Sequence, residues 1–160
     1  MIFFLMLYQS YHILYSFQNL NIMPKVTVGA VLTRETDQEI KVLLTKRNVE
    51  PFRHFWCIPG GHIEQHENAV DAVIREVKEE TCLNMQEPEF LGYMDEIFPE
   101  RGVHNVVLLF WGTAPNEAIA NPDEVTEIGW FSLTQALKMD LAFRHREAIE
   151  LFMKHRAEPH

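Results

Sequence analysis

Cysteine is scarce in this chain, with only Cys57 and Cys82 among 160 residues. They do not form a CxxC pair, so the sequence indicates neither a disulfide framework nor a cysteine-bound structural zinc. We therefore expect a reducing, cytoplasmic location. Basic residues are also few, because 14 Lys and Arg stand against 23 Asp and Glu and give a formal net charge of −9. A surface this acidic argues against nucleic acid as a partner, since phosphate backbones attract basic proteins.

Charged residues are missing altogether from residues 1–23, MIFFLMLYQSYHILYSFQNLNIM. A signal peptide needs a basic first region, and a membrane-spanning helix needs about 20 mostly apolar residues, whereas polar side chains such as Gln9, Ser10 and Gln18 interrupt this stretch. No membrane partner is expected. We expect residues 1–23 to be a dispensable extension that need not be native, with Met23 as the natural first residue, and residues 24–160 to form one domain. The alternative is an anchor to a membrane surface.

Apolar segments of two periodicities follow, in a chain that is 47% hydrophobic. The β-branched segments 25–33 and 40–47 predict a hairpin, and Pro59-Gly60-Gly61 predicts a turn. A helix is expected to begin near Glu67 or Asn68, and a closing helix to cover 143–156. Further strands are expected at 89–98, 106–114 and 127–133. This order predicts the α/β class, with a mixed sheet between helices.

The helix after the glycine turn carries clustered acids. Because a helix advances about 100° per residue, Glu76, Glu79 and Glu80 fall within one arc of roughly 100°. The apolar Val70, Val73, Ile74 and Val77 are expected on the opposite side, packed on the sheet, so the acids are expected to face outward. Clustered carboxylates suit Mg²⁺ or Mn²⁺. The alternative is an ordinary solvated acidic face.

The wider spacing of these residues resembles the motif of the Nudix hydrolase family. That motif reads Gly, five residues, Glu, seven residues, Arg-Glu, an aliphatic residue, any residue, Glu-Glu, any residue, Gly and a final aliphatic residue. The matching residues are Gly61, Glu67, Arg75, Glu76, Val77, Glu79, Glu80 and Leu83. Cys82 stands where the family has Gly, and we expect it to be partly buried, at a cost of about 1 kcal/mol in a left-handed cap. The resemblance implies a Nudix-type α/β/α sandwich.

The chemistry that the resemblance implies is metal-dependent hydrolysis of a diphosphate linkage in a nucleoside diphosphate derivative. The implied cofactor is Mg²⁺, for which Mn²⁺ can substitute. Its ligands would be Glu76, Glu79 and Glu80 with the carbonyl of Gly61. The catalytic set would be Glu79, Glu80, Glu76 and Arg75, with Arg75 orienting the acids and Glu67 supporting it. The general base stays open among Glu96, Glu100, Asp123 and Glu124.

The partner that the resemblance implies is a small-molecule nucleotide. Pro99 lies sixteen residues beyond Leu83, a position associated with the ADP-ribose pyrophosphatase branch, which favours ADP-ribose or a nucleotide sugar. Candidate substrate contacts are Arg47, Arg53, Phe55, Arg101 and His104. Two alternatives remain, a pyrophosphohydrolase of modified nucleoside triphosphates and a nucleotide-binding sensor without turnover. A homodimer is compatible with the branch.

Overall fold

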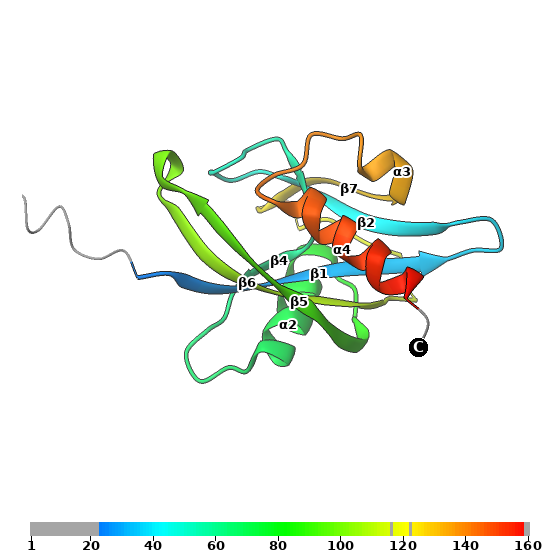
Figure 1. The fold of residues 1–160 in the computed structure, drawn as a ribbon, viewed down its shortest axis with the longest axis horizontal. Helices are drawn as coiled ribbons and strands as arrows, with labels where there is room; N and C mark the ends of the chain where they lie inside the picture. The colour runs from blue at the N-terminus through cyan, green and yellow to red at the C-terminus, as the bar shows by residue number, and fades with distance from the viewer. Residues whose placement is uncertain (1–22, 116, 122, 159–160) are drawn as a thin grey trace, which may run out of the picture.

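The computed structural model describes residues 23–158 except 116 and 122, so most of the predicted N-terminal extension lies outside the described residues. The strands are β1 (Lys25–Glu35), β2 (Ile40–Arg47), β3 (Trp56–Cys57), β4 (Gly60–His62), β5 (Gln86–Phe98), β6 (Val103–Thr113) and β7 (Val125–Ser132). The helices are α2 (Ala69–Thr81), α3 (Leu133–Ala136) and α4 (His145–Ala157), with a short 3₁₀ turn η1 (Pro99–Arg101) (Figure 1). None of the helices in the described part of the chain has the length and apolar character needed to cross a membrane.

The strands form one mixed sheet in the order β3-β2-β1-β6-β5, to which β4 adds beside β1 and β7 beside β2. Strands β1 and β6 run parallel, whereas the other pairs are antiparallel. The predicted hairpin is confirmed, because β1 pairs with β2 from Thr33 opposite Val42 to Glu35 opposite Ile40. The predicted mixed sheet is likewise confirmed.

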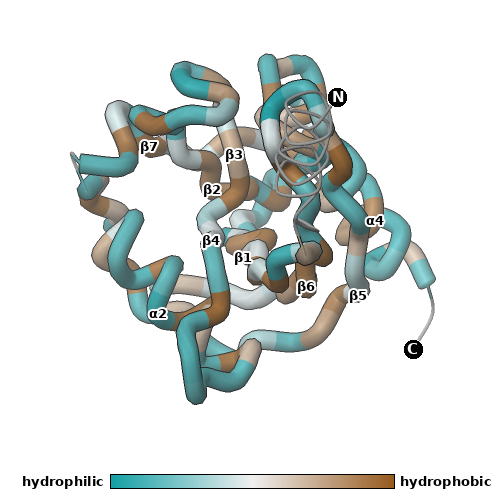
Figure 2. The backbone as a smooth tube through the Cα atoms, turned by 90° about the vertical axis from the view of Figure 1, so that its left-hand side faces the viewer, coloured by the Kyte–Doolittle hydropathy of each residue, from teal (hydrophilic) through white to brown (hydrophobic). Residues whose placement is uncertain are grey.

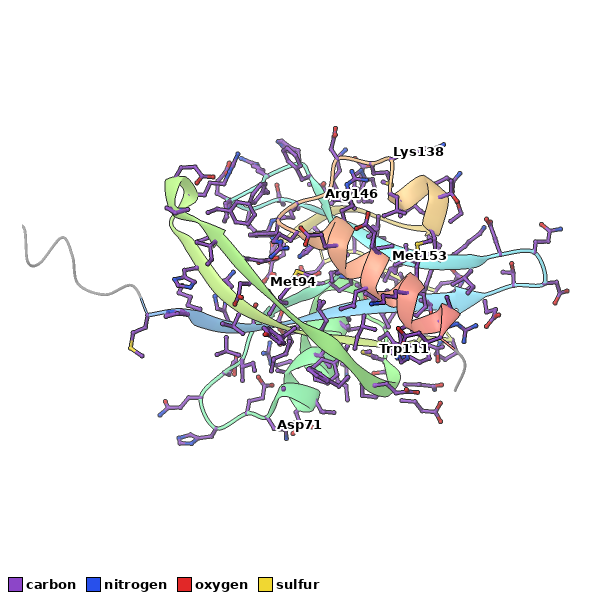
Figure 3. All side chains as sticks on the ribbon, viewed as in Figure 1. Asp71, Met94, Trp111, Lys138, Arg146 and Met153 are labelled. Atoms are coloured by element: carbon purple, nitrogen blue, oxygen red, sulfur yellow. The ribbon has the colours of Figure 1, made fainter. Side chains whose placement is uncertain are left out.

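Helices α2 and α4 cover opposite faces of the sheet, which confirms the predicted sandwich (Figure 2). On one face, Val73 and Val77 of α2 pack with strand residues such as Leu32. On the other face, Ile149 and Phe152 of α4 are buried. Figure 3 shows Met94 and Trp111 on the strands that α4 crosses, and the Trp111 ring lies 5.6 Å from that of Phe152. These two cores fix α2 and the ends of the strands, which together carry the candidate site.

Helix α2 has a hydrogen-bonded cap at each end. The side chain of Asn68 accepts a hydrogen bond of 2.9 Å from the backbone N–H of Asp71, which is a standard way to begin a helix. At the other end Cys82 has φ 58°, and its backbone N–H donates to the Lys78 carbonyl. The left-handed cap predicted from the family's Gly is therefore confirmed. The prediction that Cys82 is partly buried was wrong, because its side chain is exposed.

The outward orientation predicted for the acids of α2 was also wrong in part. Glu80 is only 6% exposed, whereas Val70, predicted to be inward, is 41% exposed. The helix geometry explains the difference, because Glu80 is seven residues from Val73 and therefore lies about 20° from it around the helix axis. Glu80 consequently shares the buried side of the helix and reaches the sheet.

Candidate active site

The glycine turn places the main chain of β4 directly against the acidic helix. Gly60 and Gly61 pair with Gly29 and Val28 of β1, so the turn is part of the sheet. A Cβ atom on Gly61 would lie 2.5 Å from both carboxylate oxygens of Glu76, which is closer than such atoms approach. Any larger residue there would require the Glu76 carboxylate to move. The turn and the helix thus form one site.

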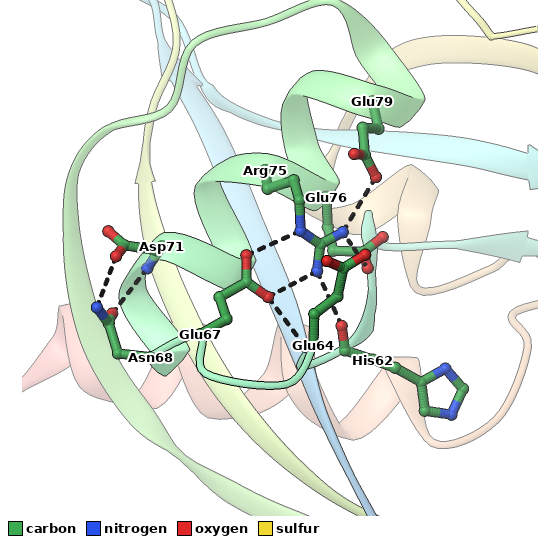
Figure 4. Close-up of polar contacts among 8 residues, drawn as sticks. All are labelled: His62, Glu64, Glu67, Asn68, Asp71, Arg75, Glu76 and Glu79. Carbon is green, nitrogen blue, oxygen red and sulfur yellow. Dashed lines mark hydrogen bonds and ion pairs between the residues drawn. The ribbon is translucent and has the colours of Figure 1, made fainter.

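Arg75 gathers the side chains around this contact (Figure 4). Its Nε and Nη2 donate to the two carboxylate oxygens of Glu67 at 2.8 and 2.9 Å. Its Nη1 donates to Glu76 at 2.9 Å and to Glu79 at 3.0 Å. Its Nη2 also donates to the backbone carbonyl of His62, at 2.9 Å. One guanidinium therefore links the loop before α2, three carboxylates and strand β4.

The charge of Arg75 is balanced mainly by Glu67. The hydrogen bonds from Arg75, helped by the backbone N–H of Glu64, lower the pKa of the Glu67 carboxyl to about 2. The same contacts raise the pKa of Arg75, although partial burial opposes this. A paired arginine of this kind fixes side chains in place. Arg75 and Glu67 are thus arranged to position the acids around them.

Glu80 is the most buried acid of the helix. Burial raises its pKa to about 8, the charges of Glu76 and Glu124 add to this rise, and a hydrogen bond from the Gly60 backbone and the Arg47 charge oppose it. Its Oε2 also accepts a hydrogen bond of 3.4 Å from the hydroxyl of Thr45. A carboxylate with few donors and two acidic neighbours is stabilised by a nearby cation.

Glu124 is the member of the later acids that lies beside this group. It lines the same cleft as Glu76 and Glu80. Burial is the largest cause of the raised pKa of these two acids, and the charge of Glu124 raises both further. Glu124 precedes β7, and its backbone carbonyl accepts from the Asn48 N–H at 2.8 Å. Among the four acids left open from the sequence, Glu124 is therefore the one placed to act with the helix.

The donor set fits a divalent cation, although the side chains do not yet converge on one point. In residues 23–158 without 116 and 122, no three Asp, Glu, His or Cys side chains stand close enough to hold a metal ion as they are. The reason is that Glu79 is paired with Arg75, and Glu80 is turned toward Thr45. The Glu79 side chain is 56% exposed, so its contact with Arg75 lies at the protein surface. The space kept open at Gly61 and the oxygen-only donors suit Mg²⁺.

A cleft of about 610 Å³ runs from this acidic face to an opposite wall built from other elements. Arg47, at the end of β2, lies between the two. Burial raises the pKa of both Glu80 and Glu96, and the Arg47 charge lowers both. Its Nε donates to the Pro51 carbonyl at 3.0 Å, and its guanidinium lies 5.1 Å from the centre of the Phe143 ring. The cleft therefore holds a fixed cation where an anionic ligand would pass.

The structure brings only part of the predicted substrate contacts into this cleft. Arg47, Arg101 and His104 line it, and the Arg101 guanidinium lies 4.2 Å from the centre of the Phe52 ring. Arg53 and Phe55 do not line it. Arg53 donates to the side chain of Asn48 at 3.2 Å, and Phe55 stands edge-on to Phe52 at 5.8 Å and is 38% exposed. Both belong to the loop between β2 and β3.

The opposite wall also holds buried polar residues, of which only Glu96 was named from the sequence, as one of four candidate general bases. Glu96 of β5 is 3% exposed and lies opposite Asn105 of β6 in the sheet. Burial raises its pKa, while Asn105 and the backbone of Arg144 lower it. His145, at the start of α4, accepts a hydrogen bond of 3.2 Å from the Ile58 N–H, and burial lowers its pKa to about 3. The sequence signal for the burial of Glu96 is its position two residues after the buried Met94, because residues two apart on a strand point to the same face.

Comparison with known proteins agrees with this arrangement. Residues 23–152 match the NUDIX domain. The "ADP-ribose pyrophosphatase" of Methanocaldococcus jannaschii is 30% identical over 131 residues, which are 82% of this chain and 74% of that protein. The "ADPR responsive transcriptional repressor NtrR" of Acinetobacter baylyi is 25% identical over 130 residues, and this chain covers 52% of its length. The NUDIX domain of Shewanella oneidensis NrtR, solved with ADP ribose, has a TM-score of 0.77 and 26% identity, over 88% of this chain and 96% of that one. The chain belongs to the Nudix hydrolase family.

Proposed function

We propose that this protein is a metal-dependent pyrophosphohydrolase that cleaves the diphosphate linkage of ADP-ribose or of a nucleotide sugar. The observation that carries the proposal is the Arg75 network, which holds Glu76, next to Gly61, and Glu79 in a cleft that Arg47 also lines. The 30% identity to a protein named ADP-ribose pyrophosphatase supports this substrate class. The proposed cofactor is Mg²⁺, with Mn²⁺ as a substitute.

The proposed reaction breaks one phosphoanhydride bond. A water molecule attacks one phosphorus atom, the bridging oxygen leaves with the other phosphate, and the water gives up a proton. ADP-ribose would yield AMP and ribose 5-phosphate. A metal bound by Glu76, Glu79, Glu80 and the Gly61 carbonyl would neutralise charge on the phosphates and acidify the water. In this proposal Glu124, whose charge acts on Glu76, would accept the proton, and Arg47, which lines the cleft, would bind a phosphate oxygen.

The test is a hydrolysis screen with identified products. The protein is incubated with Mg²⁺ or Mn²⁺ and ADP-ribose, NADH, nucleotide sugars, dinucleoside polyphosphates or oxidised nucleoside triphosphates. Metal-dependent release of AMP from ADP-ribose is expected. Release of pyrophosphate from a triphosphate instead would identify the protein as a pyrophosphohydrolase of modified nucleoside triphosphates. Glu79→Gln should lower turnover by about 100-fold or more while the protein stays folded, whereas Glu150→Gln, an exposed change on α4, should not.

The second candidate is a nucleotide-binding sensor. It is favoured by the similarity to a protein named as an ADPR responsive repressor, of which this chain covers about half. The two candidates differ in turnover, because a sensor binds ADP-ribose and releases no AMP. Tight binding measured by calorimetry, with no product after long incubation in Mg²⁺ or Mn²⁺, would replace the hydrolase proposal with the sensor.

A further inference from the structure

One carboxylate oxygen in the wall of the cleft opposite α2 is buried without a hydrogen bond. Glu96 Oε2 accepts from the side-chain amide of Asn105 at 3.4 Å, whereas Oε1 is inaccessible to solvent and makes no hydrogen bond in the described structure. An unsatisfied acceptor in this position costs free energy, and more so when it is charged. A side chain kept in this state inside a ligand-sized cleft is expected to have a partner in the ligand.

The neighbouring protein donors do not supply that partner. Nδ1 of His145 accepts from the Ile58 backbone, so the neutral imidazole carries its proton on Nε2. Nε2 lies 3.6 Å from Glu96 Oε1, which is longer than a hydrogen bond. The backbone of Arg144 is close enough to lower the pKa of Glu96, yet Oε1 remains without a hydrogen bond. Glu96, Asn105 and His145 all line the cleft, so the free acceptor belongs to its wall.

Glu96 is separate from the acids of helix α2. The negative charge of Glu124 raises the pKa of both Glu76 and Glu80. The charges that shift the pKa of Glu96 are instead the positive ones of Arg47 and Arg144. Glu96 is therefore not one of the clustered carboxylates that suit a cation. A phosphate group would be repelled by it, so the complementary ligand group is an uncharged donor at the far end of a nucleotide from its phosphates.

We propose that the Glu96 side chain turns toward the cleft when substrate binds and that its Oε1 then accepts a hydrogen bond from the nucleoside part, either from the exocyclic amine of the base or from a ribose hydroxyl, and thereby determines substrate specificity. This inference rests on the proposed function, since it assigns the recognition end of the same cleft. Phe143 lines the cleft next to His145, with ring centres 5.3 Å apart, and provides an apolar surface for the ring of a base. A nucleotide analogue without the donor would leave the buried acceptor unpaired, so such a site discriminates strongly against that analogue.

The variant Glu96→Gln reverses the hydrogen-bonding character of this wall. The Asn105 amide donates to one side-chain oxygen, so the single oxygen of Gln is expected to face Asn105 and its NH₂ group to face the cleft. A donor then replaces the acceptor. AMP binding, measured by calorimetry without metal or turnover, is expected to weaken about 10- to 100-fold. Glu89→Gln on the exposed side of the same strand is the matched control and should bind as the unchanged protein does.

The two sources of the donor are separated by the choice of nucleotide. If the base amine is the donor, the unchanged protein should prefer AMP to IMP, and Glu96→Gln should remove that preference. If a ribose hydroxyl is the donor, the unchanged protein should prefer AMP to 2′-deoxy-AMP or 3′-deoxy-AMP, and Glu96→Gln should remove that preference. Glu96→Asp gives an independent variant, because it keeps the charge and withdraws the acceptor by one methylene. Circular dichroism and thermal unfolding check that each variant is folded.

Two results would overturn the inference. One is affinity of folded Glu96→Gln and Glu96→Asp within about twofold of the unchanged protein for every nucleotide. The other is no measurable binding of any of these nucleotides to the unchanged protein. Because binding is measured without turnover, a failure of the hydrolysis screen with intact, Glu96-dependent AMP binding would reject the proposed function and leave this inference standing.

Discussion

Replacing Glu80 with Gln should stabilise the metal-free protein at high pH while it abolishes catalysis. Glu80 is 6% exposed, and burial raises its pKa from an ordinary 4.5 to about 8. The folded protein therefore prefers the neutral acid. The stability that this preference contributes is fully present below pH 4.5 and is lost as the pH rises through about 8. Gln keeps the shape and hydrogen bonding of the neutral acid and does not ionise.

The size of the effect follows from the difference between the two pKa values. At about 1.4 kcal/mol for each pH unit, the ionised Glu80 costs the folded state roughly 3–5 kcal/mol at pH 9. For a domain of this size, that corresponds to roughly 10 °C in the midpoint of thermal unfolding. Bound Mg²⁺ should remove the same cost in the unchanged protein, since a cation favours the ionised form.

The assay is thermal unfolding from pH 5 to pH 9 in the presence of a chelator. The melting temperature of the unchanged protein should fall relative to that of Glu80→Gln as the pH rises, because the other titrating groups are common to both proteins. Glu79→Gln is the matched control, since it removes the same charge from an exposed position on the same helix. Melting temperatures of the unchanged protein and Glu80→Gln that stay within about 2 °C of each other at pH 9 would refute this prediction.

Three further predictions concern other parts of the structure. Arg75→Lys should lower kcat by about 10- to 100-fold with little change in KM, because an ammonium group cannot make the forked contacts to Glu67; steady-state kinetics with an unchanged kcat would contradict this. Cys82→Gly should raise the free energy of unfolding in urea by about 1 kcal/mol, because Cys82 has φ 58°, and Cys82→Ala should give no such gain. Phe152→Ala should cost about 3–5 kcal/mol in the same assay, since Phe152 is 1% exposed, whereas the exposed Met153→Ala should cost under about 1 kcal/mol.

The elements that the sequence predicted are those that depend on local pattern. The acidic helix was expected near residue 67 or 68 and begins at Ala69, after the Asn68 cap. The hairpin was expected over 25–47 and was found there, because alternating β-branched residues and a polar turn act within a few residues. The outward orientation predicted for Glu80 was wrong because Val73, which the prediction assigned to the opposite side of the helix, lies only about 20° from Glu80 around the helix axis.

The two walls of the cleft differ in how the sequence encodes them. The acidic wall comes mainly from a turn and a helix within residues 61–80, so spacing alone groups its side chains. The opposite wall joins Glu96, Asn105 and His145 from β5, β6 and α4. The register that sets Glu96 opposite Asn105 and the packing of α4 depend on tertiary structure, so the local sequence pattern does not predict them.

This difference separates the reaction from the choice of substrate. The local motif specifies groups suited to hydrolysis at phosphorus, which many members of one fold can share. Recognition of the nucleoside depends on residues such as Glu96, whose buried oxygen takes part in the cleft only after the sheet has formed. Substitutions at Glu96 are therefore expected to change which nucleotide binds, and substitutions at Glu79 are expected to change how fast it is cleaved.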